Sequence, residues 1–229
     1  LVTPGVAFTE SVLERRENNF LASVYMGKAV GGISFLDIST GEFLLAEGQF
    51  DYIDKLLANF NPKEILVEKS KISDFQDVFG TKYNLFKLDD WVYSAELGQE
   101  KLEKQFQVTS LKGFGVDSLS FGMAAAGATL YYLELTQHNQ LKHVATIARI
   151  DQEHYVWLDK FTVRNLELFG NVNEGGKTLL SVIDRTTTPM GARLLRRWIS
   201  LPLKDVTPIR ERLNAVEYLI NHSEDKGIL

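Results

Sequence analysis

The chain has 229 residues, of which 45% are hydrophobic, 11% aromatic and 24% charged, and its formal net charge is −5 at pH 7. This length and composition are typical of one large or two small domains with real cores, and we expect no membrane partner because no apolar run could cross a bilayer. The absence of cysteine excludes disulfides and cysteine-ligated metal and agrees with a cytoplasmic protein. The sequence starts at Leu1 rather than methionine, and its last predicted helix runs almost to the end, so we expect a piece of a longer protein.

The first hundred residues are predicted to form an α/β unit. Three strands come first, at 20–26, 30–38 and 42–46, and Ser39-Thr40-Gly41 supplies the tight turn before the third. An amphipathic helix follows at 50–60 and ends at Asn61-Pro62. The remaining elements are a strand at 64–68, a helix at 72–79, a strand at 83–87 and a helix at 94–106. The order βββ-α-β-α-β-α predicts a mixed sheet in a ribonuclease-H-like arrangement.

The second half is predicted to be mainly helical. A helix at 118–136 presents an alanine-rich surface suited to close packing, and 161–169 has a second helical pattern. Thr188 before Pro189 is a typical helix start. The threonine hydroxyl can accept a hydrogen bond from a free backbone N–H, and the N–H that proline lacks would have no partner at the first helical position. That helix, at 189–200, ends before Pro202, and Thr207-Pro208 begins a last helix at 208–221.

A possible phosphate-binding loop is rejected on its spacing. Gly175-Gly176-Lys177-Thr178 resembles the end of a P-loop, which needs a glycine five residues before the Gly-Lys pair. That position is Asn171, while Gly170 comes one residue too early. No buried strand precedes the segment, so we predict a flexible turn.

A two-metal nuclease is an alternative function for this fold, and it would need clustered carboxylates. The first strand has no acid, whereas Asp37 and Glu42 flank the hairpin turn and could approach each other. An Asp before Ser-Thr-Gly more often bonds its own backbone in a turn. The four histidines are too scattered for a metal cluster, at His138, His143, His154 and His222.

The helix at 189–200 carries the main basic patch. Residues 1–113 hold 12 Lys and Arg against 17 Asp and Glu, which argues against DNA binding there, whereas 184–212 holds seven basic residues against three acidic ones. Arg193, Arg196 and Arg197 share one side of the helix, where they could contact DNA phosphate or another domain. One alternative is a stand-alone DNA-binding module with salt-sensitive affinity. The preferred interpretation is a solvated face whose arginine stems cover apolar neighbours.

Two stretches of the sequence resemble the MutS family of DNA mismatch repair proteins. The more specific stretch, 161–203, is similar to the start of the family's core, or lever, domain. It contains Asn165-Leu166-Glu167-Leu168, a glycine-containing loop, Thr178 to Thr186, and Thr188-Pro189-Met190-Gly191 opening the basic helix. The other stretch, 1–43, resembles the start of the connector domain. It contains Leu1 to Gly5, Glu17 to Ala22 and Gly32 to Phe43.

The resemblance implies a ribonuclease-H-like α/β domain with a mixed sheet, followed by a mainly α-helical partial core domain. The connector domain would cover 1–113 and be non-catalytic, the linking helix would cover 114–140, and the truncated first core segment would cover 141–229. The family's mismatch-reading, clamp and ATPase domains would lie outside this chain. We therefore expect no enzymatic activity and no cofactor here, while the full-length protein would use ATP and Mg. A truncated core is also expected to expose apolar helix faces.

By the same resemblance, the full-length protein would be a homodimer that binds mismatched duplex DNA. This piece would couple the mismatch-binding and ATPase domains, with the helices at 189–200 and 208–221 transmitting movement. The connector domain would also help to contact MutL. We place that partner surface on the acidic helix around Glu96, Glu100 and Glu103.

Overall fold

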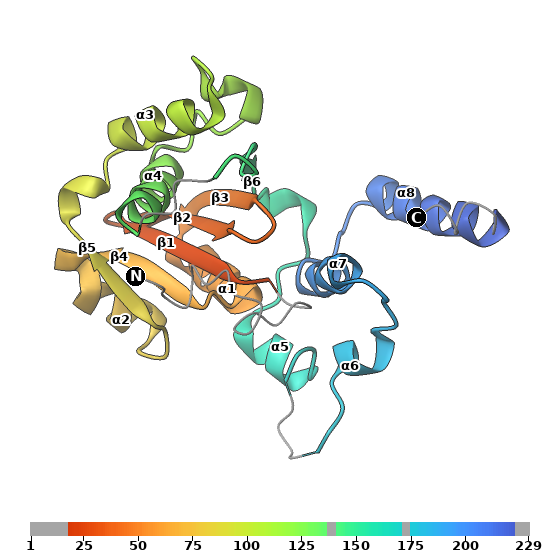
Figure 1. Ribbon diagram of the computed structural model, residues 1–229. Coiled ribbons are helices and arrows are strands. Elements are labelled where there is room, and N and C mark those ends of the chain that lie inside the picture. Colours follow the sequence, from red (N-terminus) through yellow and green to blue (C-terminus); the bar gives the residue numbers. More distant parts are fainter. Residues whose placement is uncertain (1–17, 137–140, 171–174, 223–229) are drawn as a thin grey trace.

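The computed structural model describes residues 18–136, 141–170 and 175–222, and its centre is one mixed β-sheet (Figure 1). The strand order is β5-β4-β1-β2-β3-β6. Strands β1, β2 and β3 are antiparallel neighbours, whereas the pairs β1–β4, β4–β5 and β3–β6 are parallel. The strands are β1 (Phe20–Met26), β2 (Val30–Asp37), β3 (Glu42–Gln49), β4 (Glu64–Glu68), β5 (Leu85–Leu88) and β6 (Ala148–Arg149).

Alternation along the strands builds a separate apolar core on each face of the sheet. Ala22 and Phe35 are register partners and face the core beneath α1 (Phe50–Phe60) and α2 (Ile72–Phe79). Their neighbours Leu21 and Leu36 face the core beneath α4 (Ser120–Leu135), on which α3 (Ala95–Phe106) is stacked (Figure 1). Successive residues of a strand point to opposite faces, and both faces of this sheet are covered. The central strands are therefore apolar at almost every position.

Glycines allow α4 to lie unusually close to its neighbours. A Cβ at Gly32 on β2 would come within 2.0 Å of the Phe121 backbone, and a Cβ at Gly98 on α3 would come within 2.2 Å of the Met123 carbonyl oxygen. The helix expected to link the two domains therefore packs on the sheet, inside the first unit. The domain boundaries at 113 and 140 stay predictions.

The predicted elements of the first hundred residues are confirmed, with small changes in their bounds. Strand β6 was not predicted, and the helix expected at 161–169 was drawn too long. That helix, α5 (Lys160–Asn165), stops before Glu167, whose φ of 47° is left-handed and cannot continue a helix. The structure also has short 3-10 turns: η2 (Lys69–Lys71), η3 (Asp90–Val92), η4 (Leu111–Phe114) and η5 (Gln152–His154).

From Lys160 onward the described chain is mainly helical and less buried. Besides α5 it contains α6 (Leu179–Ile183), α7 (Pro189–Ser200) and α8 (Val206–Asn221). The predicted start of α7 is confirmed, because the Thr188 hydroxyl accepts from the Gly191 N–H at 3.1 Å and Pro189 is the first helical residue. Helix α8 has no buried side chain, and it exposes large apolar residues. No described helix is long and apolar enough to cross a membrane.

Candidate functional site

The β2–β3 hairpin meets α7 through an ion pair. Glu42 is the first residue of β3, and its carboxylate pairs with the Arg197 guanidinium on α7. The two side chains are 25% and 31% exposed, so water reaches the pair only in part. Burial, and then the positive charge of Arg212, lower the pKa of Arg197. Both effects oppose the charged guanidinium, so the Glu42 carboxylate is its compensating partner.

The other arginines of the predicted basic face have different neighbours. Arg196 lies over the Phe169 ring at 4.7 Å. Arg193 lines a cavity of about 530 Å³ between α7 and the hairpin, together with Arg197 and the hairpin residue Thr40. A cation above an aromatic face is attracted to it and keeps its stem on apolar surface. The three arginines therefore lie on one helix, and at least two of them contact other parts of this chain.

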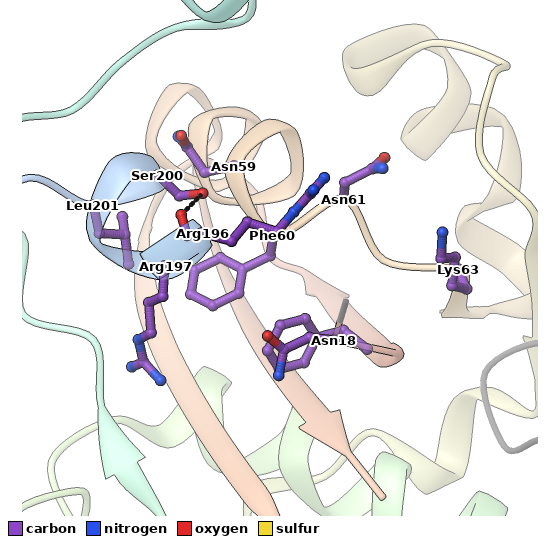
Figure 2. Close-up of a pocket in the computed structure, with 10 residues that line it drawn as sticks. Asn18, Asn59, Phe60, Asn61, Lys63, Arg196, Arg197, Ser200 and Leu201 are labelled. Carbon is purple, nitrogen blue, oxygen red and sulfur yellow. Dashed lines mark hydrogen bonds between the residues drawn. The ribbon is translucent and has the colours of Figure 1, made fainter. Parts of the chain in front are cut away.

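A small cavity marks where the end of α1 approaches the end of α7 (Figure 2). Phe60 and Asn61 line it from the first unit, and Arg196 and Ser200 line it from α7. Its volume is about 40 Å³. That is room for one or two water molecules and far too little for a nucleotide or a base.

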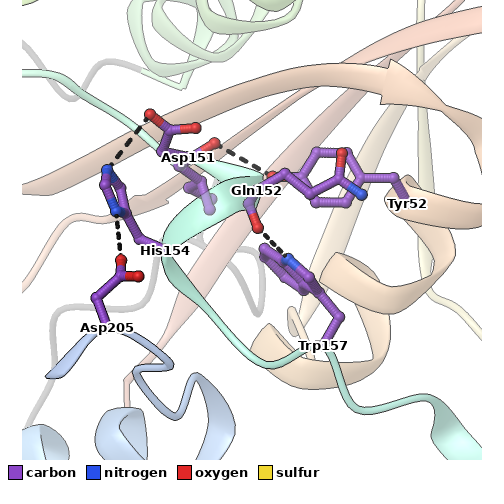
Figure 3. A network of polar contacts seen from close by, with 7 residues as sticks. Tyr52, Asp151, Gln152, His154, Trp157 and Asp205 are labelled. Atoms are coloured by element: carbon purple, nitrogen blue, oxygen red, sulfur yellow. Dashed lines mark hydrogen bonds and ion pairs between the residues drawn. The ribbon is translucent and has the colours of Figure 1, made fainter.

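Residues 150–159 connect the α/β unit, which ends with β6, to the helical part, which begins with α5. This linking segment is bonded to the α/β unit. The Tyr52 hydroxyl on α1 donates to the Ile150 carbonyl at 3.2 Å (Figure 3). Burial, followed by the charge of Asp151, raises the pKa of Tyr52, so the hydroxyl stays protonated and able to donate. Trp157 packs edge-on against the Tyr52 ring at 4.9 Å and donates from Nε1 to the Gln152 carbonyl. The segment thus follows α1 instead of hanging free.

The same segment is also bonded to the loop between α7 and α8. The Val156 N–H donates to the Pro202 carbonyl at 2.8 Å, and the Lys204 N–H donates to the His154 carbonyl at 3.3 Å. The His154 ring lies between two carboxylates, with Nδ1 3.1 Å from Asp205 and Nε2 3.7 Å from Asp151 (Figure 3). Residues 154–156 therefore form a junction that is fixed on both sides.

The predicted acidic surface is present on α3. Glu96 and Glu100 are exposed, and the half-buried Glu103 accepts a hydrogen bond from Gln99 at 2.8 Å. Their spacing of four and three residues puts them on one side of the helix. The opposite side, with Gly98 and Leu102, is buried against α4. The structure brings these three carboxylates together, and their role in partner binding stays a prediction.

The two acids considered for a nuclease have structural partners. The Asp37 carboxylate accepts hydrogen bonds from Asn18 Nδ2 at 2.8 Å, from the Ser39 N–H at 2.9 Å and from Ser39 Oγ at 2.6 Å. Asp37 therefore shapes the turn, as its sequence context favoured, while Glu42 faces Arg197. Within 18–136, 141–170 and 175–222, no three His, Asp or Glu residues are grouped so that they could hold a metal ion.

The segment that resembled the end of a P-loop leads into a very short helix. Thr178 caps α6 by accepting from the Ser181 N–H at 3.0 Å, and Gly175 has a left-handed φ of 82°. A five-residue helix after a capped turn agrees with the predicted turn. Asn171, which stands where a P-loop needs a glycine, lies outside the described residues.

The contacts of residues 150–159 and the partner of Arg197 were not predicted from the sequence. Tyr52 and Asn59 lie within the helix predicted at 50–60, whose periodicity does not indicate that they contact a distant segment. The available signal was the short apolar and aromatic run Tyr155 to Leu158, which contains Trp157 and stands between polar residues after the sheet. The pairing of Glu42 with Arg197 had no local signal, since it depends on how the two parts meet.

Comparison with known proteins extends over both parts. Residues 19–145 match the family model of MutS domain II, and residues 161–229 match that of MutS domain III. The DNA mismatch repair protein MutS of Bacteroides thetaiotaomicron is 57% identical over 229 residues, which are 100% of this chain and 27% of that protein.

Two further relatives carry the same name. MutS of Phocaeicola vulgatus is 58% identical over 229 residues, covering 100% of this chain and 26% of that protein. MutS of Flavobacterium johnsoniae is 54% identical over 224 residues, covering 98% of this chain and 26% of that protein. The chain thus spans about a quarter of the length of these curated relatives.

Proposed function

We propose that this chain, which belongs to the MutS family of DNA mismatch repair proteins and corresponds to MutS domains II and III, couples the mismatch-binding and ATPase domains of such a protein. The observation that carries this proposal is the junction at 154–156, which is hydrogen-bonded to the loop between α7 and α8 and continues a segment fixed to α1. A movement of the helical part would reach the sheet through this junction rather than be lost in a free tether.

The proposal assigns the first unit the role of a non-catalytic, ribonuclease-H-like connector domain. Strand order β5-β4-β1-β2-β3 with helices on both faces supports that arrangement. Mismatched duplex DNA, ATP with Mg and a second subunit would be engaged by the full-length homodimer, through domains beyond this chain.

A second part of the proposal is that α3 offers a surface to the repair partner MutL. Glu96, Glu100 and Glu103 are gathered on the side of α3 that faces away from α4. The hairpin and α7 meet elsewhere, so this surface is separate from the joint between the two parts (Figure 1). An exposed acidic face favours a basic partner surface and speeds its association.

Changing the acidic face tests the MutL proposal directly. We expect Glu100→Lys combined with Glu103→Lys to weaken binding of the chain to its cognate MutL about tenfold, which corresponds to ~1.4 kcal/mol. The weakening is expected because lysines would repel a basic partner surface that the glutamates attract. Isothermal titration calorimetry would measure the dissociation constant.

A matched control changes the net charge by the same amount, but on the opposite face of the sheet. Asp51→Lys with Asp77→Lys alters exposed residues of α1 and α2 and should leave MutL affinity unchanged. Equal weakening by both double variants would point to net charge alone and would remove α3 as the partner surface. Unchanged binding by the α3 variant would have the same consequence.

A further inference from the structure

The joint between the two parts contains two kinds of contact. Residues 154–156 are held to the loop between α7 and α8 largely by backbone hydrogen bonds, from Val156 to Pro202 and from Lys204 to His154. The hairpin is held to α7 by the side chains of Glu42 and Arg197. Backbone bonds survive most substitutions, whereas a side-chain ion pair depends on two particular residues. Between the hairpin and α7, the ion pair is therefore a contact that a single change can break.

The two apolar cores do not extend across this joint. Both clusters consist of buried residues from 20–150, and none comes from α5, α6, α7 or α8. The buried apolar residues Ala192 and Leu201 of the α7 region lie outside both clusters. Without a shared core, the placement of α7 against the hairpin depends on polar contacts more than a domain interior does.

The surroundings of Arg197 make its partner important. The guanidinium is partly buried, and Arg212 adds a second positive charge nearby. If Glu42 were neutral, a partly buried cation would remain beside another cation, which favours movement of α7 into water. The cavity of about 530 Å³ beside the pair, lined by Thr40 and Met190, shows that the hairpin and α7 are not tightly packed there.

We propose that Glu42 and Arg197 are positioning residues that hold the β2–β3 hairpin against α7, and that breaking this pair lets the helical part pivot about the junction at 154–156. The proposal rests on the coupling role proposed above and gives it a specific closed arrangement. In that arrangement the hairpin and α7 move together. In the open one the junction still connects the sheet to α7, while the hairpin and α7 are apart.

The chain is well suited to a distance measurement because it contains no cysteine. Lys104→Cys on α3 and Thr187→Cys just before α7 are exposed positions for two spin labels. Pulsed electron–electron double resonance would give the distribution of distances between the two spin labels. We expect one narrow distribution for the parent, and a broadened, shifted distribution for Glu42→Gln.

A charge swap separates positioning from general damage. Arg197→Glu should broaden the distribution as Glu42→Gln does, and combining it with Glu42→Arg should restore the narrow distribution. Asp74→Asn is the control, because it removes an ion pair with Lys71 inside the first unit, 2.8 Å long, and should change nothing. If Arg197→Glu fails to fold, Glu42→Gln alone decides the outcome.

An unchanged distance distribution for folded Glu42→Gln would overturn the proposal, as would a swapped pair that stays broad. These outcomes are independent of MutL binding, which is measured at α3. A responsive distance with no effect of the α3 variant would keep the positioning pair and remove the partner surface. The reverse result would do the opposite.

Discussion

Glu68 shows how a single buried carboxylate can affect the stability of the fold. It ends β4, is 8% exposed, and its Oε2 has no hydrogen-bond partner among the described residues. Burial raises the pKa of Glu68 from 4.5 to about 7, an effect that the Met26 backbone N–H opposes and Asp90 reinforces. The folded state therefore prefers the protonated acid, whereas the unfolded chain ionises it at lower pH.

This gives a pH-dependent cost that a neutral side chain should remove. The penalty is absent below about pH 4.5, grows as pH rises to about 7, and is constant above that. We expect Glu68→Gln to be more stable than the parent above pH 7, by on the order of 2 kcal/mol, and nearly equal near pH 4.5. Urea unfolding at pH 5, 6, 7 and 8 would measure the difference, and parallel curves would contradict it.

At the scale of elements, the stacking of α3 on α4 depends on close backbone approach. A Cβ at Gly127 would lie 2.4 Å from the Gly98 Cα atom, and one at Gly98 would lie 2.2 Å from the Met123 carbonyl oxygen. Neither neighbour is the end of a flexible side chain. The helices must therefore separate if either glycine gains a side chain.

Alanine at this contact should destabilise the chain even though alanine favours helices. We expect Gly98→Ala to lower the free energy of unfolding by about 1–3 kcal/mol. Gly113→Ala, where nothing lies within 4 Å of the added Cβ, is the control and should change it by about 0.5 kcal/mol or less. Thermal unfolding would compare them, and equal stabilities would show that α3 and α4 can move apart at little cost.

Elements with local signals were predictable, and those formed by distant partners were not. The helix at Phe50–Phe60 has strong amphipathic periodicity, and Thr188-Pro189 fixes the start of α7, so both agree with their predicted bounds. Strand β6 has two residues and exists because Ala148 pairs with Leu44. The acidic face of α3 followed from helical spacing, whereas the pairing of Arg197 with Glu42 is decided by tertiary packing.

At the scale of the whole molecule, Asn59 ties the linking segment to α1. Its Nδ2 donates to the Lys55 carbonyl at 2.7 Å and to the Leu158 carbonyl at 3.0 Å. Farther along, the Lys160 ammonium lies 3.5 Å from the Asp54 carboxylate on the same helix. The segment is therefore held along α1 by side chains as well as by the backbone bonds near 154–156.

Removing the Asn59 side chain should loosen this segment without unfolding the sheet. We expect Asn59→Ala to speed amide hydrogen exchange at residues 155–160, because the Leu158 carbonyl loses its donor, at a cost of about 1–3 kcal/mol. Mass spectrometry of exchanged peptides would detect this. Gln99→Ala, an exposed amide bonded within α3, is the control. Unchanged exchange at 155–160 would show that Asn59 does not hold the segment.

The packing of α4 on the sheet also has a consequence for folding during synthesis. Strands β1 to β5 are complete once residue 88 has left the ribosome, but the helix that covers one sheet face extends to Leu135 and the last strand lies at Ala148–Arg149. Until α4 has emerged, Leu36 and Leu45 have no helix to cover them. The nascent chain must therefore keep an apolar sheet face away from other unfolded chains until about thirty more residues have emerged beyond α3, and exposed apolar surface makes aggregation more probable during this interval.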